Sequence, residues 1–292
     1  MKLITIIADH NRHDDTLACL KSLEGCASHI WRVIVIDNGS EQPLLLPAGT
    51  LNIQLIRLEF NSGFSAAFNL GIQHALGAGA DAILVLNNDT LVASNFLVPL
   101  LSALDSGAGI VAPRIYYASD PTRIWAEGFA AHSWTLEIRK STRGKLERAE
   151  TATPQSVDYV TGCAMLVSRR VFDAIGLFDE RFFAYYEDFD FCIRARQAGF
   201  QIMIVPSSRV WHKVSTTTGL DTPRRQYLMA RSSVLFFAKH AGRRWPVIVA
   251  YRTGSLIKTL ANLAWHRRLD LIAAHIKGIR DGWRDAQHRK KR

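Results

Sequence analysis

Three carboxylates lie within four positions of one another in the segment FFAYYEDFDFCIRARQAGF (182–200). They belong to Glu187, Asp188 and Asp190, and six aromatic residues surround them. Neighbouring carboxylates repel one another, and burial among apolar groups raises a carboxylate pKa because the charged form is disfavoured. A carboxylate tuned in this way can take a proton from a hydroxyl group as that group attacks. The segment therefore indicates acid–base chemistry.

The neighbouring side chains have simpler explanations. Asp190 and Arg194 are four residues apart, a spacing that predicts an ion pair on one face of a helix. Glu187 either caps that helix or contacts a substrate. Three aromatic residues are expected in the hydrophobic core: Phe178, Phe182 and Phe183.

Polar residues also occur where three predicted strands end. They are Asp37 in VIVID, Asn61-Ser62-Gly63 after IQLIRLEF, and Asn87-Asn88-Asp89 after AILVL. An acidic residue at a strand end is often only a turn former, but three such places at one sheet edge indicate a ligand site. Mg²⁺ and Mn²⁺ prefer oxygen ligands of this kind and usually share substrate phosphates. The small residues of NSGFSAAFNLG (61–71) let backbone amides approach a charged ligand closely.

The elements that position these residues alternate between strand and helix. Apolar runs predict strands at 3–8, 33–37, 53–59, 82–87 and 109–116. Helical spacing predicts helices at 14–23, 64–76 and 95–104. This alternation favours a mostly parallel sheet with helices on both faces. Farther along, we expect a hairpin in 124–139, a polar loop at 140–156, a strand at 157–167 broken at Thr161-Gly162, and another strand at 201–206.

The composition suits one large α/β domain with an appendage. The chain has 292 residues, of which 48% are hydrophobic. Its formal net charge of +10 is uneven: residues 224–292 contain 17 Lys and Arg against three acids, whereas residues 1–223 carry a net −4. Two helical segments in the basic part, 254–266 and 269–279, each place apolar residues on one face. A basic amphipathic surface of this kind favours anionic membrane headgroups over nucleic acid, and no nucleic acid partner is expected.

The sequence contains no run of about 18 apolar residues that would predict a transmembrane helix. The start, MKLITIIADHNR, lacks the features of a signal peptide, and the four cysteines form no CxxC pair. We therefore expect reduced thiols in a cytoplasmic protein attached peripherally to the inner face of the cell membrane.

Several segments together resemble one enzyme family. VIVIDNGS, NSGFSAAFNLG, LVLNNDT, TGCAMLVSRRVFDAIGLFDERFFAYYEDFDFCIRARQAGF and WHKVSTTTG occur in the order found in family 2 glycosyltransferases. The chain is most similar to the rhamnosyltransferase-like branch that builds bacterial surface polysaccharides such as O-antigen. The resemblance covers about residues 3–220. It implies a GT-A fold: a Rossmann-like, mostly parallel nucleotide-sugar-binding sheet flanked by helices, here with a basic helical C-terminal extension.

The resemblance assigns roles to the residues at matching positions. Asp188 matches the general base, Asp89 the metal-binding acid, and His212 the histidine that completes the metal site. The substrate-binding positions implied by the resemblance are Asn11, Asp37, Asn61, Gly63, Asn69, Asn87, Asn88, Tyr185, Tyr186 and Glu187. Among these, Asp37 and Asn11 would line the pocket for the donor base. Asn61, Gly63 and Asn69 would shape the nucleotide and sugar pocket. Tyr185 and Tyr186 either stack on an acceptor sugar or face protein.

The implied organisation is a GT-A domain at 1–221, with a nucleotide-binding half at 1–115 and an acceptor-binding half at 116–221, followed by basic helices at 222–292. The implied reaction is inverting transfer of a sugar from a dTDP- or UDP-linked donor to a hydroxyl group of a lipid-linked or polysaccharide acceptor, with Mg²⁺ or Mn²⁺. L-Rhamnose from dTDP-rhamnose is the first expectation for the donor. Galactofuranose, glucose or an N-acetylhexosamine from UDP remains an alternative, as does a catalytically idle nucleotide-sugar-binding scaffold.

Overall fold

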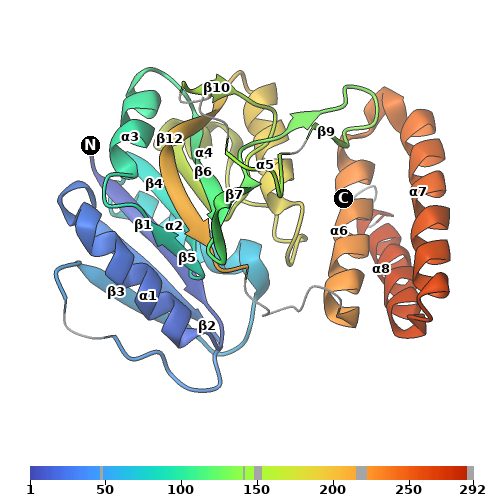
Figure 1. Cartoon of the computed structure of the whole chain (residues 1–292), viewed down its shortest axis with the longest axis horizontal. Helices are drawn as coiled ribbons and strands as arrows, with labels where there is room; N and C mark the ends of the chain where they lie inside the picture. The colour runs from blue at the N-terminus through green and yellow to red at the C-terminus, as the bar shows by residue number, and fades with distance from the viewer. Residues whose placement is uncertain (47–48, 141, 148–152, 215–221, 288–292) are drawn as a thin grey trace.

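A ten-stranded mixed sheet forms the centre of the molecule in the computed structural model, which describes residues 1–46, 49–140, 142–147, 153–214 and 222–287 (Figure 1). Its strand order is β10-β12-β6-β11-β4-β1-β2-β3, with β5 paired to β12 and β7 paired to β6. The strands are β1 (Leu3–Asp9), β2 (Arg32–Asn38), β3 (Ile53–Leu58), β4 (Ala82–Asn87), β5 (Thr90–Val92), β6 (Ile110–Tyr117), β7 (Asp120–Ala126), β10 (Gln155–Ser156), β11 (Ala164–Ser168) and β12 (Ile202–His212). A separate two-stranded sheet pairs β8 (Ala130–Ala131) with β9 (Ile138–Lys140).

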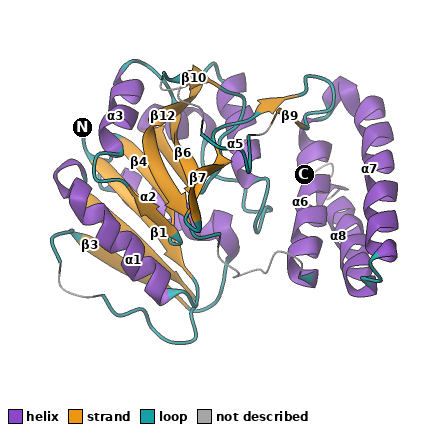
Figure 2. Cartoon of the chain, in the orientation of Figure 1, coloured by secondary structure: helices purple, strands orange, loops and turns teal. Residues whose placement is uncertain are grey.

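Helices pack around this sheet, which forms the central layer in Figure 2. Those of the first 200 residues are α1 (His13–Leu23), α2 (Gly63–Gly77), α3 (Leu97–Asp105), α4 (Arg169–Ile175) and α5 (Glu187–Gln197), together with a 3₁₀ helix at Glu24–His29. The predicted strands and helices of residues 3–116 are therefore present, with ends that differ by at most two residues.

The first four strands are parallel to one another, as predicted. β1 pairs with both β2 and β4, and β2 pairs with β3. The interiors of β1, β2 and β4 are apolar and buried on both faces, which is typical of parallel strands covered by helices. β11 differs, because it runs antiparallel between β4 and β6. The sheet as a whole is thus mixed, and the prediction of a mostly parallel sheet holds for its first half.

Three predictions for the middle of the chain need correction. Of the strand expected at 157–167 with a break at Thr161-Gly162, only the part after the break is a strand, which begins at Ala164; at the break, Gly162 donates its backbone N–H to Asp188. The hairpin expected in 124–139 is smaller: Ile124 belongs to β7, which pairs with β6, and the hairpin itself joins β8 to β9. The expected loop at 140–156 contains β10, while residues 141 and 148–152 lie outside the described part of the chain.

Three helices follow the sheet and lie side by side at one end of the molecule (Figure 1): α6 (Pro223–His240), α7 (Trp245–Trp265) and α8 (Leu269–Gln287), with a 3₁₀ turn at Gly242–Arg244. α6 packs closely along α8 because Gly278 and Gly282 lack side chains. A Cβ atom at Gly278 would lie 2.4 Å from the Tyr227 carbonyl oxygen, and one at Gly282 would lie 2.7 Å from that of Arg231.

The face of α8 that meets α6 is not its apolar face. Leu271, Gly278 and Gly282 are buried, whereas Leu269 and Ile276, which belong to the apolar face expected from the sequence, are 71% and 52% exposed. The glycine stripe allows the closer approach of the two backbones and therefore decides which face meets α6. Among the described helices, none combines the length and the apolar character required to cross a bilayer.

Candidate active site

Asp37 lies one residue before the end of β2 and is completely buried. Its Oδ1 accepts a hydrogen bond from the Ser40 backbone N–H at 3.0 Å, and its Oδ2 accepts one from the Leu44 N–H at 3.3 Å. Burial raises the pKa of Asp37, but these hydrogen bonds and the charge of Arg57 outweigh burial, so that the pKa is lowered overall. The charged carboxylate therefore orders the loop after β2, and its predicted contact with the donor base remains a prediction.

Asn11 and Asn88 form hydrogen bonds near the ends of β1 and β2. Asn11 adopts a left-handed conformation (φ 57°), and its Oδ1 accepts from the Glu41 N–H at 2.8 Å, which ties the loop after β1 to the loop after β2. Asn88 donates from Nδ2 to Asp9 Oδ1 at 3.0 Å. Asp9 is buried beside Asp37 in the strand register and was not among the predicted site residues. Its position at the end of β1 is the same sequence signal that identified Asp37.

Asn61 and Gly63 shape the turn into α2. Asn61 Oδ1 accepts from the Gly63 N–H at 2.9 Å and from Asn38 Nδ2 at 3.3 Å. Gly63 has φ +87°, and a Cβ atom there would lie 2.5 Å from the Phe183 carbonyl oxygen. This position therefore requires glycine for two independent reasons. The turn is packed directly against the segment that precedes α5.

Asn69 is bound at both ends of its side-chain amide by the segment before α5. Its side chain is buried, with Nδ2 donating to the Phe178 carbonyl at 2.9 Å and Oδ1 accepting from the Phe178 N–H at 3.0 Å. Both ends of the amide thus bind protein backbone. Nδ2 also donates to Glu180 Oε1 at 2.9 Å, so Asn69 joins α2 to the segment before α5, and its role in shaping the donor pocket remains a prediction.

Asp89 and His212 are brought together by the pairing of β5 with β12. Thr90 is opposite His212 in this register, so the residue before Thr90 meets the imidazole. Asp89 Oδ1 lies 3.0 Å from His212 Nε2, and both side chains are less than 10% exposed. The Trp125 ring packs edge-on against the imidazole at 4.3 Å. Asn87, which ends β4, is bound through its backbone N–H to the Cys163 carbonyl at 2.8 Å.

This pair fits a divalent cation that keeps other ligands. In the described residues His212 Nδ1 is buried without a hydrogen-bond partner, and no group of three or more His, Cys, Asp or Glu side chains could enclose an ion. One carboxylate and one imidazole leave most coordination positions to water and to phosphate oxygens, the arrangement that Mg²⁺ commonly adopts. Asp89 and His212 are therefore the side chains that could hold a cation.

Glu187 and Asp188 begin α5, after two consecutive left-handed residues, Tyr185 (φ 70°) and Tyr186 (φ 69°). Asp188 Oδ2 accepts from the Gly162 N–H at 3.0 Å, and Oδ1 accepts from the Phe189 N–H at 2.8 Å. Burial raises the pKa of Asp188, and these hydrogen bonds only partly oppose the rise.

Glu187 is buried more completely than Asp188. Its side chain is 6% exposed, and in the described residues its Oε2 has no hydrogen-bond partner. Burial and the neighbouring charge of Asp188 raise the pKa of Glu187 well above its usual range. The pKa of Glu187 is therefore raised further than that of Asp188, whose carboxylate accepts two backbone N–H hydrogen bonds.

Gly162 and Cys163 connect the two acidic sites. Gly162 donates to Asp188, and the next residue, Cys163, accepts from Asn87, two positions before Asp89. Burial raises the pKa of the Cys163 thiol, and the charges of Asp89, Cys19 and Asp188 raise it further. The candidate base and the candidate cation ligands therefore lie in one region, although they are 99 positions apart in the sequence.

The predicted ion pair between Asp190 and Arg194 is confirmed, but it is part of a larger cluster. Arg194 Nε donates to Asp190 Oδ2 at 2.9 Å, while His240 Nε2 lies 2.8 Å from Oδ1 and Lys239 also contacts Oδ1. Burial raises the pKa of Asp190, but the hydrogen bond from His240 and the charges of Arg194 and Lys239 outweigh it and lower the pKa. Sequence reasoning did not anticipate the two residues from α6.

The aromatic residues around the acidic segment divide into two groups. Phe178 and Phe182 are buried in the core, as predicted, whereas Phe183 is partly exposed. The Tyr186 ring packs on Phe236 of α6 at 5.2 Å between centroids, and burial raises the pKa of Tyr186 to about 12. Tyr186 therefore faces protein, and the sugar-stacking alternative is left to Tyr185.

Comparison with known proteins connects this geometry with an activity. Residues 5–176 match the model of a family described as "Glycosyl transferase family 2". The chain is 24% identical over 265 residues to dTDP-rhamnosyl transferase RfbF of Shigella flexneri, and the alignment covers 86% of each chain. It is 27% identical over 289 residues to the N-acetylglucosaminyl-diphospho-decaprenol L-rhamnosyltransferase of Mycobacterium tuberculosis, covering 87% of this chain and 92% of the relative.

Solved structures show the same fold. The mannosyltransferase PcManGT from Pyrobaculum calidifontis, in complex with GDP-Man and Mn²⁺, superposes with a TM-score of 0.57 at 15% identity and covers 95% of this chain and 87% of its own. GalNAc-T7 with UDP, GalNAc and Mn²⁺ gives a TM-score of 0.56 at 17% identity, covering 82% of this chain and 50% of its own. The predicted GT-A fold is confirmed.

Proposed function

The chain belongs to glycosyl transferase family 2 and is a glycosyltransferase that uses a nucleotide-sugar donor, and we propose that it transfers L-rhamnose from dTDP-rhamnose, with inversion, to a hydroxyl group of a lipid-linked saccharide. The two rhamnosyltransferase relatives support this choice of donor over UDP-linked sugars. The decaprenol-linked substrate in the name of the mycobacterial relative supports a lipid-linked acceptor.

The observation that carries this proposal is the placement of Asp188 next to the Asp89–His212 pair through Gly162 and Cys163. An acceptor hydroxyl is a poor nucleophile at neutral pH, so a carboxylate must take its proton during attack. Asp188 would have that role because two backbone N–H groups stabilise its charged form, whereas burial and the neighbouring charge raise the pKa of Glu187 further.

The metal site has a complementary role. Asp89 and His212 would hold Mg²⁺ or Mn²⁺, and a cation there supplies stabilisation of the negative charge that develops on the leaving nucleoside diphosphate. The Mn²⁺ in the complexes of PcManGT and GalNAc-T7 supports a divalent cation in this fold. Asp37, Asn11, Asn61 and Gly63 would contact or shape the nucleotide pocket from the ends of β1 and β2 and the start of α2.

Replacement of the base tests the proposal directly. Asp188→Asn should abolish rhamnosyl transfer and still bind dTDP-rhamnose, which is measured as protection against thermal unfolding. Asp173→Asn, an exposed carboxylate on α4, is the matched control and should keep full activity. Full activity in Asp188→Asn would refute the assignment of the base. Transfer from UDP-glucose or another UDP-sugar in preference to dTDP-rhamnose would refute the donor.

We also propose that α7 and α8 attach the enzyme to the anionic inner face of the cell membrane. Trp265 is 85% exposed, Ile257 64% and Leu269 71%, and Arg267 and Arg268 lie between Trp265 and Leu269 in the sequence. Large apolar groups mixed with cations suit the interface between headgroups and acyl chains.

Liposome co-sedimentation tests this attachment. Trp265→Ser with Leu269→Ser should reduce binding to vesicles containing anionic lipid, with no change in thermal unfolding because both side chains are exposed. Point variants are preferable to truncation because α8 packs on α6. Equal binding by the double variant and the wild type, or tighter binding to RNA than to vesicles, would contradict the proposal.

A further inference from the structure

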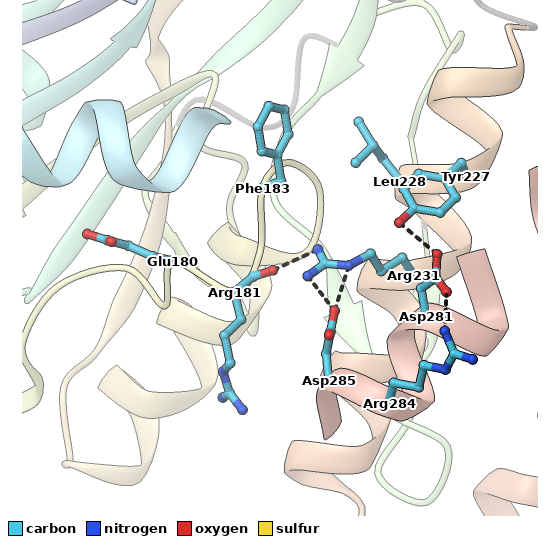
Figure 3. A pocket seen from close by; sticks show the side chains of 9 residues that line it. All are labelled: Glu180, Arg181, Phe183, Tyr227, Leu228, Arg231, Asp281, Arg284 and Asp285. Atoms are coloured by element: carbon cyan, nitrogen blue, oxygen red, sulfur yellow. Dashed lines mark hydrogen bonds and ion pairs between the residues drawn. The ribbon is translucent and has the colours of Figure 1, made fainter. Parts of the chain in front are cut away.

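A pocket with a volume of about 510 Å³ lies between the segment before α5 and the helices α6 and α8 (Figure 3). Its size falls within the range of small-ligand pockets, about 300–1,000 Å³. It does not include Asp89, Asp188 or His212. Three arginines and three carboxylates supply its charged groups: Arg181, Arg231, Arg284, Glu180, Asp281 and Asp285.

The charged groups of the α6–α8 wall are paired with one another. Arg231 Nε donates to Asp285 Oδ2 at 2.8 Å, and its Nη1 donates to the Arg181 carbonyl at 2.9 Å. Arg284 lies 3.8 Å from Asp281, which also accepts a hydrogen bond from the Tyr227 hydroxyl at 3.2 Å. Figure 3 shows the pairs of Arg231 with Asp285 and of Arg284 with Asp281 on the α6–α8 side, and Arg231 reaching across to the Arg181 carbonyl.

This balance of charge identifies the class of ligand. A pocket for a phosphate or diphosphate would need an excess of cations, whereas here equal numbers of arginines and carboxylates line the walls. A carboxylate has about four lone-pair positions, so paired carboxylates still accept hydrogen bonds from hydroxyl groups, while arginines donate to ring and hydroxyl oxygens. Phe183 and Tyr227 add aromatic surface. These features suit a neutral, polyhydroxylated ligand.

Phe183 joins the pocket to the candidate active site. On its other side a Cβ atom at Gly63 would lie 2.7 Å from the Phe183 ring, and the Phe183 carbonyl accepts from the Phe64 N–H at 2.7 Å. The Phe64 ring in turn would lie 3.0 Å from a Cβ atom at Gly162, which binds Asp188. Phe183 therefore lies between the pocket and the turn at Gly63, and Phe64 links that turn to Gly162 and Asp188.

We propose that this pocket binds a neutral saccharide unit of the acceptor, next to the unit whose hydroxyl group attacks. The inference rests on the proposed glycosyl transfer and adds to it the chemical class recognised outside the reaction centre. It also places the enzyme after another glycosyltransferase, which must have supplied the unit that fills the pocket.

Binding of free sugars tests the site independently of catalysis. The probe is an array of neutral oligosaccharides, read with the full-length protein, and inorganic pyrophosphate and anionic vesicles serve as competing ligands. Asp281→Asn combined with Arg284→Ala should weaken capture of the bound oligosaccharides about tenfold or more, as expected when a hydrogen bond to a charged group is lost. Asp120→Asn combined with Arg123→Ala is the matched control, because it removes an exposed Asp–Arg pair on β7 that does not line the pocket.

The outcomes separate the two proposals. Capture of no oligosaccharide by the wild type, or equal capture by wild type and the double variant, would overturn the saccharide site. Pyrophosphate or vesicle binding that is lost in the double variant would instead identify an anion site and also overturn it. Failure of dTDP-rhamnose to protect the protein from unfolding would count against the proposed donor alone, because Asp281 and Arg284 are not part of the nucleotide region.

Discussion

Asp190→Asn should destabilise the protein strongly, although Asp190 is not expected to touch a substrate. Its carboxylate is completely buried and contacts three cationic or ionisable side chains: Arg194 of α5, and Lys239 and His240 of α6. Asparagine has nearly the same shape but no charge. The substitution therefore tests whether the ion cluster, and not only the packing, holds α5 against α6.

The expected loss in free energy of unfolding depends on the contacts that Lys239 and Arg194 keep after the substitution. Removal of one member of a buried ion pair costs about 3–5 kcal/mol, because the other charge is left uncompensated. Lys239 keeps a contact with Asp179 at 2.7 Å, and Arg194 keeps a hydrogen bond to the Ile175 carbonyl at 2.8 Å. We therefore expect the lower end of the range, about 3 kcal/mol. With an m-value of about 3 kcal/mol per molar urea, the midpoint of unfolding should fall by about 1 M.

The effect should also depend on pH. The pKa of Asp190 is lower in the folded than in the unfolded protein, so its contribution to stability is present above the unfolded pKa of about 3.9 and is lost as the pH falls through the lower folded value. The difference in free energy of unfolding between the wild type and Asp190→Asn should therefore be full at pH 7 and shrink below about pH 4.

Urea unfolding followed by circular dichroism measures both effects. Asp120→Asn, which removes an exposed carboxylate paired with Arg123, is the control and should unfold at the wild-type midpoint. A double-mutant cycle with Lys239→Met isolates the pairwise energy. If Asp190→Asn unfolds at the same midpoint as Asp120→Asn, or if the cycle shows no coupling, the ion cluster does not stabilise the contact between α5 and α6.

Three further predictions concern the site itself. Gly63→Ala should lower the thermal unfolding midpoint in calorimetry and weaken dTDP-rhamnose binding, because φ +87° and the nearby Phe183 carbonyl both oppose a Cβ atom; an unchanged midpoint would contradict this. The rate of transfer should rise with pH through a midpoint above about 3.9, the usual value for Asp, because burial raises the pKa of Asp188 and only the charged form accepts a proton; a pH–kcat profile measures it. EDTA should abolish transfer, and added Mn²⁺ should restore it. His212→Ala should require a higher Mn²⁺ concentration for half-maximal activity. Activity unaffected by EDTA would exclude the metal role.

The sequence predicted the first half of the fold closely because its signals are local. Apolar runs such as AILVLN and polar residues at their ends specify a parallel strand and the edge where ligands gather, and both lie within a few residues of one another. Asp37 and Asp89 were found in this way. Asp9 ends β1 in the same register and could have been found by the same reasoning.

β12 shows where local pattern failed. The predicted strand stops at residue 206, where Pro206, Ser207 and Ser208 interrupt the apolar run. The observed strand continues to His212 through an irregularity between Val205 and Arg209. That second half carries His212 to Asp89, so the contact between the two depends on a strand pairing that no local feature encodes. Only the resemblance to a family indicated it.

The helices that follow the domain boundary expected between residues 221 and 222 also support the candidate active site. Ser232 of α6 donates to the Ala184 carbonyl at 2.8 Å, and Arg231 donates to the Arg181 carbonyl at 2.9 Å. These contacts, with Tyr186 on Phe236, support the two left-handed tyrosines that precede α5, in which Asp188 binds Gly162.

The aromatic residues around the acidic segment therefore have different structural roles, which the sequence alone could not distinguish. Phe182 fixes the segment in the core, Tyr186 fixes it to α6, and the partly exposed Phe183 separates the saccharide pocket from Gly63. Because α8 supplies both the far wall of that pocket and the exposed Leu269 and Ile276, one helix would meet the membrane and the acceptor together. Attachment through α8 would then present the pocket to an acceptor that is itself anchored in the bilayer, which raises its local concentration without any additional contact.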